Sequence, residues 1–380
     1  MPALPSPSIA AAPSISLALP IQRLEILAFD GHFFARAQSG DFRGVAALNH
    51  WTPALLSLWQ NIVLPFWMGR DARDLTADIA AIARLDRHYK LASAPFWTAV
   101  AGVELALWDL LGQASQSSVA AMLNNKPRQK VPVYLSSLRR DTSADAEVEW
   151  LSEAVARTGA KAVKVKIGGR LRWDAQTEAR DRELLKLARG QWGEKFTVYV
   201  DANGSFEMGK AIEVGALLHE HKVAWFEEPC DWEDFEATRA VAVGVQLPVA
   251  GGEQDSSFAK WKWLLENCAL DIAQPDLSYN GGLTRCWQVA QFAAQLDVST
   301  TPHSPKSGAE ALPALHFAAA LEKPAPFLEW DARLPDPPSW FNTPLEVSKG
   351  AVTLPKGAGW GAVYDEKIWK RAEILATASV

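Results

Sequence analysis

From residue 130 to about residue 330, short apolar segments alternate with longer helical patterns, and this alternation constrains the fold more than any other feature. A repeated strand–helix order places the strands parallel in one sheet with helices covering it. Eight such units predict a closed (β/α) barrel. The expected strands are 131–135, 162–167, 197–200, 223–226, 248–250, 270–273, 298–301 and 327–328.

The chain before residue 130 has a mixed pattern that predicts an α+β domain of its own. Residues 23–29 alternate polar and apolar side chains, as a half-buried strand does, whereas residues 31–44 suggest a loop with exposed aromatic side chains and arginines. Helical patterns follow at 52–66, 72–84 and 97–113. We expect four segments: a loosely ordered arm at 1–20, the α+β domain at 21–129, the barrel at 130–340, and a returning segment at 341–380.

The composition excludes several classes of partner. A net charge of −6 argues against a nucleic-acid or anionic-membrane surface. No apolar run reaches the roughly 18 residues of a membrane span, and the first 20 residues lack the basic start of a signal peptide, so a cytoplasmic location is expected. The widely spaced Cys230, Cys268 and Cys286 indicate neither a zinc site nor a disulfide framework.

Acidic residues and one histidine end successive predicted strands at nearly even intervals. From Asp201 the next five follow after 26, 26, 23, 27 and 26 residues, about one strand–helix unit each. Equivalent ends of parallel strands meet at the C-terminal mouth of a barrel, where barrel enzymes place their chemistry. The complete set is Lys166, Asp201, Glu227, Glu253, Asp276, His303 and Glu329.

So many acids at one mouth would repel one another without a cation. Mg²⁺ prefers a few carboxylates together with water and substrate oxygens. Asp201, Glu227 and Glu253 end three neighbouring strands, which predicts them as the metal ligands. Lys164 and Lys166 alternate within an apolar run, so both side chains lie on one face of their strand. Taken alone, the lysines fit a solvated sheet edge; the acids downstream favour a site.

Each residue has a simpler interpretation when it is considered singly. A lone acid at a strand end is usually a helix N-cap or a solvated loop charge, and Glu228 is interpreted as such a residue or as a partner of a site residue. His303 differs from the other histidines because it lies one unit after Asp276. An Asp–His pair on adjacent strands orients an imidazole and keeps it basic.

These motifs resemble those of the enolase superfamily, in the mandelate racemase subgroup, from about residue 22 to the C-terminus. The resemblance implies an N-terminal capping domain over a modified (β/α)7β barrel, with helix 97–113 as the capping-domain helix. The sequence differs from the subgroup at Met122-Leu123-Asn124-Asn125, where a Leu-Leu-Gly-Gly-like turn is usual. The motifs are Lys164-x-Lys166, Asp201-x-Asn203, Glu227-Glu228-Pro229, Gly252-Glu253, Asp276 with His303, and Glu329.

The resemblance also implies a chemistry, which is removal of the proton α to a carboxylate with one Mg²⁺ per subunit. Lys164 would supply a second positive charge, and Glu329, if protonated, a hydrogen bond. Lys166 and His303 would face opposite sides of the α-carbon. Dehydration of an acid sugar, an aldonate or aldarate, to a 2-keto-3-deoxy acid is the expected reaction. The alternatives are a racemase or epimerase of a 2-hydroxy acid and, more remotely, a non-catalytic metal- and acid-sugar-binding protein.

The expected partner is therefore a small carboxylate substrate, with neither nucleic acid nor membrane, and the family resemblance implies a homo-oligomer, a dimer or an octamer. Asn203, Ser136 and Ser137 are candidate substrate contacts. Four arginines could read a distal carboxylate or hydroxyl groups, or be surface charges: Arg36, Arg43, Arg139 and Arg140.

Overall fold

The computed structural model describes residues 15–85 and 90–380. The arm expected over residues 1–20 thus falls largely outside the described residues. Leu19, near its end, is 1% exposed, and its backbone N–H donates to the Asp71 carboxylate at 3.2 Å. The chain is therefore packed from Leu19 onward.

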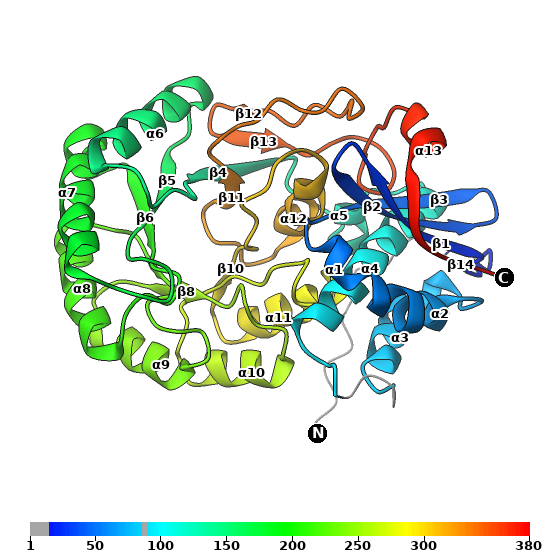
Figure 1. Ribbon diagram of the computed structural model, residues 1–380, viewed down its shortest axis with the longest axis horizontal. Coiled ribbons are helices and arrows are strands. Elements are labelled where there is room, and N and C mark those ends of the chain that lie inside the picture. Colours follow the sequence, from blue (N-terminus) through cyan, green and yellow to red (C-terminus); the bar gives the residue numbers. More distant parts are fainter. Residues whose placement is uncertain (1–14, 86–89) are drawn as a thin grey trace.

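An antiparallel sheet in the order β14-β1-β2-β3 forms one side of the molecule (Figure 1). It contains β1 (Arg23–Phe29), β2 (His32–Ser39), β3 (Phe42–Leu48) and β14 (Glu373–Ser379). The prediction of a loop over residues 31–44 is wrong, because most of that segment lies in the strands β2 and β3. Asp30 and Gly31 have φ of 51° and 74°, the positive values of a two-residue hairpin turn that joins β1 to β2.

A helical layer covers this sheet and is centred on the long helix α4 (Ala94–Ser115), which packs on β3. A Cβ at Gly44 of β3 would lie 2.1 Å from the backbone oxygen of Ala106 in α4, so the close approach requires glycine. By length and composition α4 could cross a membrane. However, 89% of its most apolar 18-residue stretch is buried inside the protein. The other elements are α1 (Thr52–Leu58), η1 (Trp59–Val63), α2 (Leu64–Trp67), η2 (Ala72–Asp74), α3 (Leu75–Ile82) and α5 (Val119–Leu123).

Parallel strands β4 to β11 form the predicted barrel, and seven helices lie around it (Figure 1). β4 pairs with β5 on one side and with β11 on the other, which brings the last barrel strand back to the first. The strands are β4 (Lys130–Ser136), β5 (Ala162–Lys166), β6 (Thr197–Asp201), β7 (Phe226–Glu227), β8 (Val249–Gly251), β9 (Ile272–Ala273), β10 (Ser299–Thr300) and β11 (Leu328–Asp331). The helices are α6 (Ala144–Thr158), α7 (Ala175–Trp192), α8 (Met208–Glu220), α9 (Phe235–Gly244), α10 (Phe258–Glu266), α11 (Leu283–Gln295) and α12 (Gly308–Ala320). The expected fold class is confirmed.

The C-terminal segment contacts both halves of the molecule. Its strands β12 (Val347–Ser348) and β13 (Ala351–Thr353) form a hairpin, and β13 pairs antiparallel with the first half of β4. After α13 (Lys367–Arg371) the chain ends in β14, which pairs with β1. The first and the last strand of the described chain thus pair in one sheet.

Candidate active site

The barrel interior has an aromatic floor with a layer of charged side chains directly above it. Tyr199 and Trp225 stack on each other with ring centroids 3.4 Å apart, and the Tyr134 ring packs edge-on against both. Asp201 and Glu227 lie two residues beyond Tyr199 and Trp225, so they share the inward face of β6 and β7. The alternation of each strand therefore carries these carboxylates to the C-terminal mouth.

Three carboxylates converge at this mouth. One oxygen from each of Asp201, Glu227 and Glu253 lies within 4.8 Å of the others. Trp225 Nε1 and Gln274 Nε2 donate to the same Glu227 oxygen at 3.2 and 2.9 Å, which fixes that side chain. Three converging carboxylate oxygens form the donor set that Mg²⁺ and similar hard divalent cations take, so these residues fit the predicted metal.

Lys164 and Glu329 form an ion pair at the centre of the charged layer. Lys164 is fully buried; its Nζ contacts Glu227 and lies 2.7 Å from Glu329 Oε1. Burial disfavours its charge, but Glu227 and Glu329 outweigh burial and raise the pKa of Lys164 well above its usual range. Burial likewise opposes ionisation of Glu329, yet Lys164 and His303 lower its pKa to about 2. The contact with Lys164 thus favours the ionised form of Glu329 over the protonated form in which it would donate a hydrogen bond.

Lys166 lies at one end of the carboxylate triplet. Its Nζ donates to Asp201 Oδ2 and, at 3.2 Å, to Asn203 Oδ1. Asn203 is held in turn by its own N–H, which donates to Asp201 Oδ1 at 2.8 Å, and by its side-chain Nδ2, which donates to Glu228. Burial opposes the charge of Asp201, but Lys166 and Lys164 lower the pKa of Asp201 below its ordinary value.

His303 lies at the other end of the triplet. Its Nδ1 is 2.8 Å from Asp276 Oδ2, and its Nε2 is 3.1 Å from Glu253 Oε2. Burial disfavours the imidazolium, but Glu253, Glu329 and Asp276 together raise the pKa of His303 to about 9. Asp276 is fixed by the Ser278 N–H at 2.6 Å and faces Lys306 at 3.5 Å. The Asp–His pair predicted from adjacent strands is therefore present as a contact.

The two serines of β4 have different environments. Ser137 donates to the buried carboxylate of Glu147 on α6, so its hydroxyl supports the loop after β4. Ser136 lies beside Lys164 in the β4–β5 pairing, and its buried hydroxyl has no hydrogen-bond partner within the described part of the chain. Ser136 and Asn203 therefore remain the substrate contacts that we propose.

Glu228 is a partner of the site residue Asn203, which is one of the two interpretations drawn from the sequence. It is 8% exposed, adopts a φ of +43°, and accepts a hydrogen bond from Asn203 at 3.1 Å. Burial and the neighbouring Glu253 raise its pKa well above the usual value. The Glu227-Glu228-Pro229 run alone did not decide between these interpretations. Strand alternation places the second glutamate off the inward face, where a solvated charge is the usual outcome.

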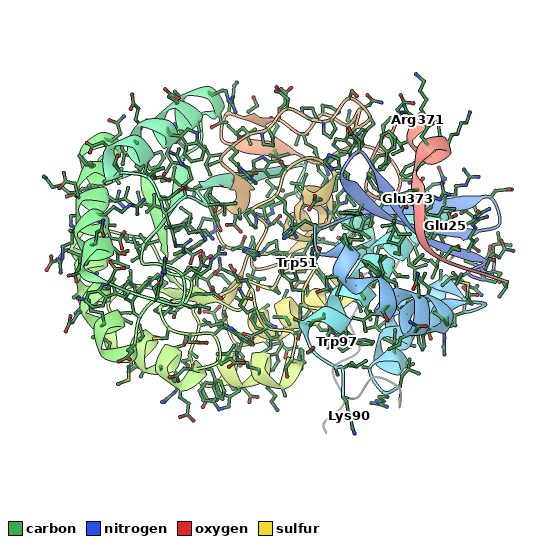
Figure 2. The ribbon with its side chains drawn as sticks, viewed as in Figure 1. Glu25, Trp51, Lys90, Trp97, Arg371 and Glu373 are labelled. Atoms are coloured by element: carbon green, nitrogen blue, oxygen red, sulfur yellow. The ribbon has the colours of Figure 1, made fainter. Side chains whose placement is uncertain are left out.

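The four candidate arginines have separate locations. Arg36 pairs with Glu25 in the antiparallel sheet at 2.6 Å, and Glu25 is labelled in Figure 2. Arg43 is exposed on β3, and the Arg139 guanidinium lies 4.7 Å from the ring centroid of Trp150. Arg140 alone of the four reaches the charged layer, where it donates to Asn203 Oδ1.

The antiparallel sheet and α1 close the mouth on the His303 side. Ala47 and Asn49, in β3 and just after it, line a cavity of about 10 Å³ together with His303 and Lys306. Trp51, labelled in Figure 2, lies close enough to Tyr279 of the loop after β9 to affect the pKa of that phenol. The N-terminal domain therefore covers the barrel mouth as a cap.

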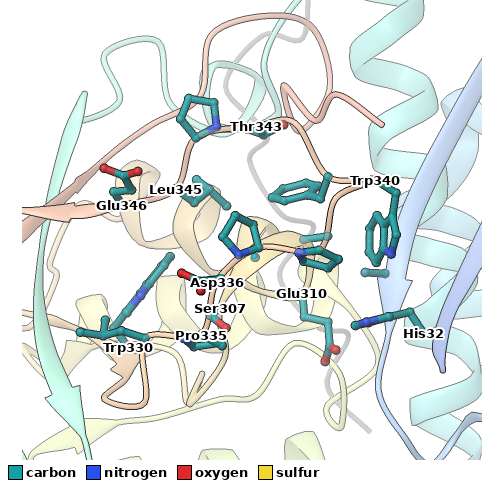
Figure 3. Close-up of a pocket in the computed structure, with 18 of the residues that line it drawn as sticks. His32, Ser307, Glu310, Trp330, Pro335, Asp336, Trp340, Thr343, Leu345 and Glu346 are labelled. Atoms are coloured by element: carbon teal, nitrogen blue, oxygen red, sulfur yellow. The ribbon is translucent and has the colours of Figure 1, made fainter. Parts of the chain in front are cut away.

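A larger cavity of about 650 Å³ lies outside the barrel, between β2, the start of α12 and the loop that follows β11 (Figure 3). Its walls include Trp330, Trp340 and several prolines, with Glu310 and Asp336 among them. None of the predicted site residues lines it. The converging charges, and not this larger cavity, therefore define the candidate site.

Comparisons with known proteins identify the family of this chain. The family model "Enolase C-terminal domain-like" matches residues 146–368. This chain belongs to the enolase superfamily. Among its relatives in that superfamily, D-galactarolactone cycloisomerase of Agrobacterium fabrum is 31% identical over 275 residues, which cover 70% of this chain and 71% of that protein. Arabinonate dehydratase of Saccharolobus solfataricus is 29% identical and covers 71% of each chain.

Solved structures of the enolase superfamily have the same architecture. A mandelate racemase/muconate lactonizing protein from Paracoccus denitrificans Pd1222, complexed with magnesium, superposes with a TM-score of 0.86 at 26% identity. The match covers 93% of this chain and 97% of that one. The resemblance drawn from the motifs is therefore confirmed at the level of the superfamily and the fold.

Proposed function

We propose that this protein removes the proton α to the carboxylate of an acid sugar and expels the β-hydroxyl, giving a 2-keto-3-deoxy acid. The observation that carries the proposal is the placement of two proton-transfer groups at the two ends of one carboxylate triplet. Lys166 contacts Asp201 at one end, and His303 contacts Glu253 at the other. Relatives named as a dehydratase and as a cycloisomerase support this class of chemistry.

Asp201, Glu227 and Glu253 would hold one Mg²⁺ per subunit, because their oxygens converge and no other group of acids and histidines in the described residues does so. A bound Mg²⁺ would act as a Lewis acid toward the substrate carboxylate. Lys164 lies against Glu227 and Glu329 and keeps its charge, so it offers a second positive group where negative charge develops.

Lys166 and His303 then share the proton transfers. Lys166, in its neutral form, takes the α-proton on Nζ as the C–H bond breaks. His303 donates the proton on Nε2 to the departing β-hydroxyl, so that the C–O bond breaks and water leaves. Asp276 holds the imidazole through Nδ1, which keeps Nε2 directed at the mouth. The enol product tautomerises to the 2-keto acid.

A substrate screen in D₂O with added Mg²⁺ tests the proposal. It presents mono- and diacid sugars and their lactones, and it follows keto product as semicarbazone absorbance and deuterium at C2 of the recovered acid. Keto product supports dehydration. Deuterium uptake with inversion and no keto product replaces it with epimerisation by the same two groups. If the screen shows no catalysis and calorimetry shows no Mg²⁺ binding, the proposal is excluded.

The His303→Asn variant tests the assigned role of the imidazole. We expect turnover to be lost while Mg²⁺ affinity is kept, because His303 is not among the converging metal ligands. His219→Asn on α8 is the matched control, since that histidine lies far from the mouth and bonds a backbone oxygen of Gln246. Full activity of the His303 variant would exclude its role.

A further inference from the structure

Arg140 is a half-buried cation at the mouth of the barrel for which the proposed mechanism has no use. It follows β4 in the chain, and its guanidinium donates to Asn203 Oδ1. Lys166 Nζ donates to the same oxygen at 3.2 Å. Two basic side chains, one of them the proton-transfer group Lys166, thus converge on a single neutral acceptor.

Arg140 also has no direct ion-pair partner among the described residues. Among the residues that the structure describes, no carboxylate oxygen lies within 4 Å of its guanidinium, and its buried Nε has no hydrogen-bond partner. The acids nearby are engaged elsewhere: Asp201 by Lys166, and Asp181 by Arg180 and the Gly168 N–H. Charges held largely out of water are normally paired, so the absence of a direct partner leaves Arg140 able to bind an anion.

A second guanidinium lies beside the first and is also incompletely satisfied. Arg180 on α7 donates to the backbone oxygens of Lys166 and Thr142, but its buried Nη2 has no partner in the described chain. Burial lowers the pKa of Arg140; the charge of Asp201 opposes this effect, and the positive charges of Arg170 and Arg180 add to it. Two guanidinium groups, each with a buried nitrogen that has no partner in the described chain, therefore lie on the side of the mouth next to β4 and β5.

We propose that Arg140 is a specificity-determining residue that binds a second carboxylate of the substrate, and that the substrates are therefore diacids of the aldarate type. This inference rests on the proposed function for the identity of the acid sugar. An arginine binds a carboxylate through paired, charge-assisted hydrogen bonds, which a hydroxyl group cannot replace in strength.

The placement of the two ends of the substrate follows from the same contacts. The first carboxylate belongs near Lys164 and the metal ligands, and the α-carbon belongs beside Lys166. Because Arg140 shares an acceptor with Lys166, the substrate chain extends from the α-carbon past Asn203 to Arg140. Asn203 thus separates the proton-transfer group from the group that reads the far end.

A binding comparison tests the subsite without requiring turnover. Adipate and hexanoate have six carbons each, differ in the second carboxylate, and have no β-hydroxyl to eliminate. With Mg²⁺ present, we expect calorimetry to show tighter binding of adipate than of hexanoate by about tenfold or more. Arg140→Gln should remove that difference and leave hexanoate unchanged, while Arg140→Lys should keep part of it. Arg139→Gln, a neighbouring arginine that packs on Trp150, is the matched control.

Kinetics provide the second measurement, with galactarate against galactonate and glucarate against gluconate. We expect kcat/KM to favour the diacid and the preference to vanish in Arg140→Gln. Equal binding of adipate and hexanoate by the wild type, or equal losses for both acids in the variant, would overturn the subsite. If no acid sugar turns over but the adipate preference depends on Arg140, the subsite stands and the proposed function fails.

Discussion

Glu104 in the cap helix α4 accepts the backbone N–H of Thr284 at the start of the barrel helix α11, at 2.8 Å. Its other carboxylate oxygen accepts the N–H of Leu283 at 2.9 Å, and Trp108 Nε1 donates to the first oxygen. A carboxylate at a helix N-terminus is favoured because the first N–H groups have no partner within the helix. A single fully buried side chain thus joins the cap to the barrel.

Replacing Glu104 by Gln should destabilise the protein. The amide keeps one acceptor oxygen but places an NH₂ group against a backbone N–H, so one buried donor loses its partner. We expect the free energy of unfolding to fall by about 1–3 kcal/mol in chemical denaturation. Glu220→Gln, at an exposed position on α8, should change it by less than about 0.5 kcal/mol. Equal stability of the two variants would contradict the role of Glu104.

In metal-free protein, Lys164→Met should lower the free energy of unfolding by more than Glu104→Gln does. The substitution leaves Glu227 and Glu329 buried without their shared cation, and breaking a buried ion pair costs about 3–5 kcal/mol. The measurement is denaturant unfolding in chelator at neutral pH.

Lys186→Met gives the surface comparison for that experiment. Lys186 is 71% exposed and pairs with Glu183 at 3.3 Å, an arrangement that contributes about 0–1 kcal/mol. If the free energy of unfolding fell by the same small amount in both lysine variants, the buried ion pair would stabilise the protein no more than the exposed one does.

Glu253→Gln tests the metal site directly. Replacing one of three converging carboxylates by a neutral amide should weaken Mg²⁺ binding by about tenfold or more, as measured by calorimetry. Glu236→Gln, an exposed acid on α9, is expected to bind Mg²⁺ as the wild type does. Unchanged affinity in the Glu253 variant would remove that residue from the ligand set.

The barrel was predictable because its signal is periodic and local. Each strand ends in a polar residue about one unit after the last, so the inward positions of β6 to β9 could be assigned from spacing alone. The segment over 31–44 was predicted wrongly because its aromatic and arginine side chains suggested exposure. The Asp30-Gly31 pair with positive φ marked the hairpin, but tertiary packing of Phe34 and Ala35 decided the strand.

The convergence of the site residues could be predicted from strand order. The direction of side chains in the loops and the ionisation states within the site could not. Nothing in the sequence indicates that Arg140, four residues beyond β4, turns inward to Asn203 while Arg139 packs on Trp150. The ionisation state of Glu329 could not be predicted from the sequence either, because it depends on the 2.7 Å contact between the Glu329 carboxylate and Lys164 Nζ and not on residue type. Such properties arise from distances that only the folded chain sets.

His316 in α12 gives a pH-dependent term in stability. Its Nδ1 accepts the Ala120 N–H at 3.2 Å and its Nε2 faces the Trp360 oxygen at 3.1 Å, so the buried ring is neutral. Burial lowers the pKa of His316 from 6.5 to about 4. Between these values the unfolded chain binds a proton that the folded chain does not, so stability falls as the pH decreases.

We therefore expect acidification from pH 7 to pH 4 to cost the wild type about 3 kcal/mol more than it costs His316→Gln. Glutamine can donate to Trp360 and accept from Ala120 without titrating. Asp109, whose pKa burial raises to about 6, acts in the opposite direction over the same range, but it is present in both proteins and cancels in the comparison. The measurement is the free energy of unfolding at several pH values. A difference that does not vary with pH would show that the ring does not titrate as its burial requires.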